Sequence, residues 1–169
     1  MRKLKINYKY NILMLAIGIF LVFFLITNIY TSINHLTVEK EVERFGSENL
    51  YGFYSSEQEN AIMYNWTMNE AVKILRKKGD VICIPISNSR PEIEENNVNL
   101  KITINDKIKG SYKMNSNDWK LVLINVKEIE DEYITIKFDI DRTWRPVDLL
   151  EDSTDERILG VKVGEIYWE

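Results

Sequence analysis

The sequence predicts an all-β domain, an antiparallel β-sandwich of the jelly-roll or immunoglobulin-like kind, preceded by one N-terminal transmembrane helix. Short stretches of alternating or wholly apolar residues follow one another from residue 50 onward, separated by turn-forming residues, as is typical of a sandwich. The helix is predicted because every residue from Ile12 to Ile26 is apolar or glycine. We expect a basic head at residues 1–10, the helix at 11–30, a stalk at 31–49 and the sandwich at 50–169.

The first thirty residues have the charge pattern of a membrane anchor. Residues 12–30 would extend roughly 28 Å as a helix, about the thickness of the hydrocarbon core of a bilayer. Arg2, Lys3, Lys5 and Lys9 precede this stretch, and the first acidic residue of the chain is Glu39. Because basic flanks stay in the cytoplasm, we expect a single-pass protein of the cell membrane with a cytoplasmic N-terminus and an extracytoplasmic domain.

A cleaved signal peptide is the alternative interpretation of this segment. Cleavage needs small residues in an Ala-x-Ala-like pattern after the apolar run, and residues 27–32 are TNIYTS. The only cysteine, Cys83, lies far beyond the run, which excludes a lipid-modified cysteine next to it. The sequence therefore favours an anchor that stays attached, with membrane lipid as its partner.

Composition excludes several classes of function. Beyond residue 30 the chain has 18 basic and 26 acidic residues, a net charge of −8, whereas nucleic-acid binders need a clustered basic face. The only histidine is His35, so the domain has neither a Ser-His-Asp triad nor a His/Cys zinc site. Asp139, Asp141 and Asp148 would suit calcium, although charges on a solvated strand face are the simpler interpretation. We expect no catalytic residue, no metal and no cofactor.

Strands are expected at 61–67, 80–87, 98–105, 107–114, 119–126, 132–140 and 158–168. Asn105 and Asp106 predict a tight hairpin turn between two of them. Residues 69–79 have the local composition of a helix, with Asn69 suited to the N-cap and Gly79 after the last turn. The β patterns on both sides favour a strand or a distorted turn there instead.

Aromatic residues beside polar ones suggest a carbohydrate site. Sugars present apolar C–H faces ringed by hydroxyl groups, which suit aromatic rings next to carboxylate and guanidinium groups. We predict Trp66 and Trp144 as stacking surfaces, with Glu57 and Arg142 as hydrogen-bonding partners. The alternative is that either tryptophan packs in the core, which is the ordinary role of a large ring between two sheets.

Three sequence blocks occur in order: Gly52-Phe53-Tyr54-x-x-Glu57 with Trp66-Thr67, then Arg142-Thr143-Trp144-x-Pro146, then Asp155-x-Arg157-x-Leu159-Gly160-Val161. Together they resemble a family of small β-sandwich domains from bacterial and archaeal envelope proteins. Such domains occur alone behind a membrane anchor or attached to glycosyltransferases that build surface polysaccharides. The resemblance covers nearly all of residues 50–169 and implies a sandwich fold with a role near surface glycans.

The last two blocks also have a purely structural interpretation. Pro146 suits a strand that leaves the sheet, and Asp155 with Arg157 suits a bidentate ion pair that holds a loop. Leu159 would then re-enter the core, and Gly160 would permit a close approach of the backbone. On this interpretation these residues attach a long loop to the last strand.

The sequence thus predicts a non-catalytic, membrane-anchored extracytoplasmic domain that binds envelope carbohydrate or assists glycan assembly. An interaction or scaffold subunit of a membrane protein complex is the alternative. An enzyme that acts on polysaccharide through carboxylates is the third hypothesis. The expected partner is an envelope glycan or a membrane protein, and not a nucleic acid.

Overall fold

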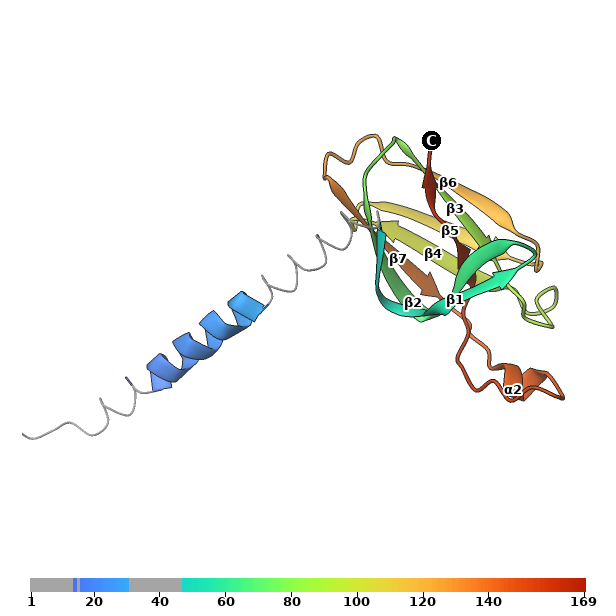
Figure 1. The fold of residues 1–169 in the computed structure, drawn as a ribbon, viewed down its shortest axis with the longest axis horizontal. Helices are drawn as coiled ribbons and strands as arrows, with labels where there is room; N and C mark the ends of the chain where they lie inside the picture. Colours follow the sequence, from blue (N-terminus) through green and yellow to red (C-terminus); the bar gives the residue numbers. More distant parts are fainter. Residues whose placement is uncertain (1–13, 15, 31–46) are drawn as a thin grey trace, which may run out of the picture. The chain divides into compact units, whose positions relative to one another are not determined.

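The computed structural model describes residue 14, residues 16–30 and residues 47–169 (Figure 1). The chain divides into two compact units, Met1–Glu41 and Val42–Glu169, and residues 16–30 of the first are helical. Within the described residues, no helix combines the length and the apolar character needed to cross a membrane. The predicted head at 1–10, positions 11–13 and 15 of the predicted transmembrane helix, and positions 31–46 of the predicted stalk lie outside the described residues.

Nine strands and one short helix make up residues 47–169: β1 (Ser47–Glu59), β2 (Ile62–Arg76), β3 (Val81–Ser87), β4 (Val98–Ile104), β5 (Ile108–Met114), β6 (Lys120–Asn125), β7 (Tyr133–Ile140), α2 (Pro146–Leu149), β8 (Lys162–Gly164) and β9 (Tyr167–Trp168). All their pairings are antiparallel, which confirms the predicted all-β fold. Strand β2 includes positions 69–76, so the strand interpretation of that segment is confirmed. β1 begins at Ser47, within the range predicted for the stalk.

The strands form one curled sheet and not two separate sheets. Its order is β5-β4-β7-β2-β8-β3-β6, with β1 added on β2 and β9 added on β3. The long strand β2 joins the layers, because it pairs with β7 through residues 70–76 and with β8 through residues 64–66. β1 follows β2 with three register shifts, which let it bend along with its partner.

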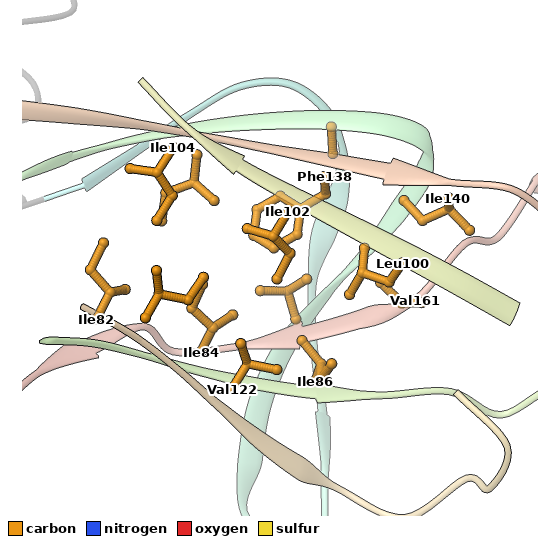
Figure 2. Close-up of a cluster of buried hydrophobic side chains, with 14 of the residues drawn as sticks. Ile82, Ile84, Ile86, Leu100, Ile102, Ile104, Val122, Phe138, Ile140 and Val161 are labelled. Carbon is orange, nitrogen blue, oxygen red and sulfur yellow. The ribbon is translucent and has the colours of Figure 1, made fainter. Parts of the chain in front are cut away.

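The core fills the space between the two layers of the curled sheet. Figure 2 shows Ile82, Ile84 and Ile86 of β3 facing Leu100 and its neighbours on β4 and β7. Alternate residues of β7 are buried, as expected for a strand with one face on the core. Each fully buried aliphatic side chain of this kind stabilises the fold by about 1.5–3 kcal/mol relative to an exposed one. Cys83 is buried and free.

Both tight hairpins use backbone conformations with positive φ. Asn105 and Asp106 have φ of 44° and 57°, which confirms the predicted turn between β4 and β5. Asn60 and Ala61 have φ of 48° and 65° in the turn between β1 and β2. Asparagine tolerates this region, whereas alanine has a steric cost there.

Replacing Ala61 with glycine is therefore expected to stabilise the domain. The gain is about 0.5–1 kcal/mol, since relief of the left-handed strain exceeds the extra backbone entropy of glycine. Urea denaturation of residues 42–169 measures the free energy of unfolding. Asn60→Gly is the matched control and should change it less. A loss of stability in Ala61→Gly would contradict the steric account of this turn.

Candidate functional site

Trp66 and Trp144 lie in a buried aromatic cluster. Their side chains are 4% and 7% exposed, and their rings meet edge to face with centroids 6.2 Å apart. Tyr64 meets Trp66 in the same way at 6.2 Å. A sugar stacks on the exposed face of a ring, so this burial contradicts the prediction that the two tryptophans are stacking surfaces. Both tryptophans instead pack in the core, which was the alternative interpretation of the sequence.

A returning loop covers the cluster. The chain leaves β7, forms α2, and comes back so that Trp144 and Leu159 exchange two backbone hydrogen bonds of 2.9 and 2.8 Å. Pro146 opens α2 in the first helical turn, where a missing N–H has no cost. Thr67 of β2 holds the end of the returning loop through two hydrogen bonds. Its carbonyl oxygen accepts from the Gly160 N–H at 2.7 Å, and its hydroxyl oxygen accepts from the Val161 N–H at 2.9 Å.

Glu57 takes part in an ion-pair network that holds this loop. Arg157 pairs with Asp155 through two nitrogens, at 3.0 and 2.7 Å, and its third nitrogen lies 2.6 Å from Glu57 Oε1. These hydrogen bonds lower the pKa of Asp155 and raise the pKa of Arg157. Tyr64 donates its hydroxyl to Glu57, and burial, with help from that carboxylate, raises the pKa of Tyr64 to about 12. The network attaches the loop to β1, and the Glu57 carboxylate is already bonded to Arg157 and Tyr64.

Lys162 closes the cluster on the side of β8. Its side chain is 4% exposed, its Nζ lies 2.6 Å from Glu59 Oε2, and the same atom lies 4.8 Å from the Tyr64 ring centroid. This buried cation is therefore compensated by a carboxylate and by an aromatic face.

The fourth predicted sugar-binding residue has a different partner. Arg142 donates to Asn96 at 3.2 Å. The structure thus brings Trp66, Trp144 and Glu57 into one structural cluster and places Arg142 against another loop. Of the aspartates considered for calcium, Asp139 pairs with Lys137 and Asp141 accepts from Asn99. In the described part of the chain, no group of three or more potential ligands is arranged to hold a metal.

A cleft of about 300 Å³ lies beside this cluster. Its walls come from β1, from both ends of β2 and from the segment 164–168, and they combine aromatic, apolar, amide, hydroxyl and charged residues. The lining residues are Ser56, Met63, Tyr64, Asn65, Lys73, Leu75, Lys78, Gly164, Glu165, Ile166 and Trp168. A second hollow of about 410 Å³ lies between residues 91–95 and 116–118, and its lining has no aromatic ring.

Lys73 is the unusual residue of the cleft. It points to the core face of β2, because its neighbours on that face, Ala71 and Leu75, are buried in the core. Its Nζ donates to Asn49 Oδ1 at 2.9 Å and lies 5.9 Å from the Phe53 ring centroid. None of the ion pairs found among the described residues includes Lys73. Burial lowers its pKa, and the more distant charges of two glutamates oppose this only in part.

Replacing Lys73 with methionine is expected to raise the free energy of unfolding at neutral pH. Burial holds the folded-state pKa of Lys73 below its ordinary value of 10.5, so the folded domain binds fewer protons than the unfolded chain between those two values. The free energy of unfolding of the wild type therefore rises with pH between the folded-state pKa of Lys73 and 10.5. The difference in this free energy between Lys73→Met and the wild type becomes smaller as the pH approaches 10.5. Urea denaturation at several pH values measures both. A difference that does not vary with pH would contradict this account.

One local pattern in the sequence points to the cleft. Alternation along residues 69–79 places Lys73 between two apolar residues on the same strand face. Trp168 and Asn65 had no comparable signal, because they come from opposite ends of the domain sequence and meet only when the sheet curls.

No protein-family model matches the chain, and no curated protein matches it. Among solved structures, one similar protein is the secreted serine protease VesC from Vibrio cholerae, at 16% identity and a TM-score of 0.36. That match covers 66% of this chain and only 22% of the VesC chain.

Two carbohydrate-binding modules are also similar. A family 35 module from an environmental isolate has 13% identity and a TM-score of 0.40, covering 72% of this chain and 95% of the module. TmCBM61, solved in complex with beta-1,4-galactotriose, has 10% identity and a TM-score of 0.35, covering 72% of this chain and 84% of that chain.

Proposed function

We propose that this chain is a membrane-anchored, non-catalytic domain that binds envelope carbohydrate on the extracytoplasmic side of the cell membrane. The observation that carries the proposal is the composition of the cleft. Trp168, Asn65 and Ser56 all line this space of about 300 Å³. An aromatic ring suits the C–H face of a sugar, and amide and hydroxyl groups suit the hydroxyls around it.

The polar groups of the cleft are held in place by the sheet. Asn65 Nδ2 donates to the Tyr54 carbonyl at 2.9 Å, which fixes the amide and leaves its oxygen as an acceptor. Trp168 pairs through its backbone with Ile82 of β3 and packs partly against the core. A preformed site of this kind loses little entropy when a ligand binds.

The apolar character of the N-terminal helix supports the anchor. In the described helical residues 16–30, the exposed fraction of the large apolar side chains ranges from 46% at Ile17 to 68% at Phe20. A helix that is apolar on all sides favours a lipid environment. The basic residues before it, from Arg2 to Lys9, favour a cytoplasmic N-terminus.

A glycan array probed with the full chain in detergent micelles tests the proposal. We expect binding to a subset of glycans, and loss of that binding in Trp168→Ala. Trp144→Phe is the matched control, because it keeps a ring in the buried cluster and should bind as the wild type does. Absence of binding to any glycan, or unchanged binding in Trp168→Ala, would contradict the proposal.

An interaction subunit of a membrane complex is the second candidate function. Apolar side chains on the loop around α2 are exposed: Val147 at 37%, Leu149 at 37%, Leu150 at 44% and Ile158 at 50%. This loop extends away from the sheet layers (Figure 1). Crosslinking in intact membranes followed by mass spectrometry separates the two functions, since specific protein partners at this loop favour the interaction subunit.

A further inference from the structure

We infer that the sugar bound in this cleft is acidic and carries a carboxylate or a phosphate group that pairs with Lys73. The inference rests on the proposed carbohydrate-binding function and goes further, because it names the chemical class of the ligand.

The first argument is the position of Lys73. A charged side chain on the core face of a strand is costly unless a partner compensates it. Asn49 supplies one neutral acceptor at 2.9 Å and the Phe53 ring lies 5.9 Å away, so the ammonium keeps donors for a further partner. Burial penalises the charged form of Lys73 more than its surroundings favour it. An anionic ligand would supply the missing compensation.

The second argument is the contrast with other lysines of the domain. Lys162 pairs with Glu59 at 2.6 Å, and Lys137 pairs with both Glu70 and Asp139 at 3.1 and 3.2 Å. Lys73 lies on the core face and has only the Asn49 amide oxygen as an acceptor, as the more peripheral Lys120 has only that of Asn115.

The third argument is the charge of the cleft itself. Lys78 lines the cleft together with Lys73, and Glu165 is the one carboxylate among its lining residues. Glu165 is exposed, and its charge reaches Lys73 only from a distance, with no ion pair between them. Among the lining residues two ammonium groups face one carboxylate, and Glu48 is the further carboxylate whose charge acts on Lys73. Trp168 would hold the sugar ring while Lys73 holds its acidic group.

Isothermal titration calorimetry of the full chain in detergent micelles tests the inference with three probes: trigalacturonate, its fully methyl-esterified form and mannose 6-phosphate. We expect an acidic probe to bind at least about tenfold more tightly than the ester, a difference of roughly 1.4 kcal/mol. A preference for trigalacturonate or for mannose 6-phosphate identifies the acidic group as a carboxylate or a phosphate.

Variants separate the inference from the proposed function. Lys73→Met should lose the preference for the acid over the ester, with a thermal unfolding midpoint at least as high as that of the wild type. Lys109→Met, which removes an exposed lysine outside the cleft, should keep the preference. Equal binding of acid and ester that disappears in Trp168→Ala would overturn the acidic ligand and leave the proposed function standing. Absence of binding by every probe and by a glycan array would overturn both.

Discussion

Replacing Gly52 with alanine is expected to lower the free energy of unfolding by about 3–5 kcal/mol, which is a large part of the stability of a small domain. Gly52 has a φ of +74°, a conformation that costs alanine strain. A Cβ atom there would also lie 2.0 Å from the Glu70 carbonyl oxygen and 2.7 Å from the Ala71 Cα. Both atoms belong to the backbone of β2, which has hydrogen bonds to β7 and cannot move cheaply.

Gly110→Ala is the matched control for this substitution. A Cβ at Gly110 would meet the Tyr112 hydroxyl at 2.5 Å, but that atom is the far end of a flexible side chain. We expect a change in the free energy of unfolding of less than about 1 kcal/mol. Urea denaturation of residues 42–169 measures both variants. Equal stabilities for the two would show that β1 does not approach β2 as closely as the structure indicates.

Replacing Trp66 with alanine is expected to cost about 3–5 kcal/mol, the usual cost of removing a large buried ring. The ring is 4% exposed and packs against Trp144 and Tyr64. Its loss would leave a cavity under the returning loop and would remove an aromatic face near Lys162. Chemical denaturation should show the loss of stability, and the folded fraction should still bind the ligand of the cleft.

Trp66→Phe keeps a ring at this position and is expected to lose less stability than Trp66→Ala. If Trp66→Ala kept the stability of the wild type and lost carbohydrate binding, the aromatic cluster would be a ligand site after all, and its structural role would be refuted.

The sequence predicted the class of fold because the strand patterns are local. Alternation at β4 and β7, and the Asn105-Asp106 turn, depend only on neighbouring residues and on turn geometry. The segment 69–79 was ambiguous, since its local propensity favours a helix and only its pairing with β1 and β7 makes it a strand. The curl of the sheet was not predictable, because it arises from one strand that pairs in both layers.

The candidate site was harder to predict because it depends on burial. Tryptophan serves both as a core residue and as a sugar platform, and nothing local to Trp66 or Trp144 distinguishes the two roles. The pairing of Asp155 with Arg157 is local and follows from their spacing of two residues. Its connection to Glu57 spans a hundred residues of sequence and needs the folded loop.

The NMR signals of the tryptophan indole N–H groups test the central claim most directly. The chain has four tryptophans, so each indole signal is assignable by substitution, and the full chain in detergent micelles can be titrated with trigalacturonate. The account predicts that the Trp168 signal moves with ligand concentration while the Trp66 and Trp144 signals stay in place. Movement of the Trp66 or Trp144 signal with Trp168 unchanged would contradict it, because the ligand would then bind at the aromatic cluster and not in the cleft.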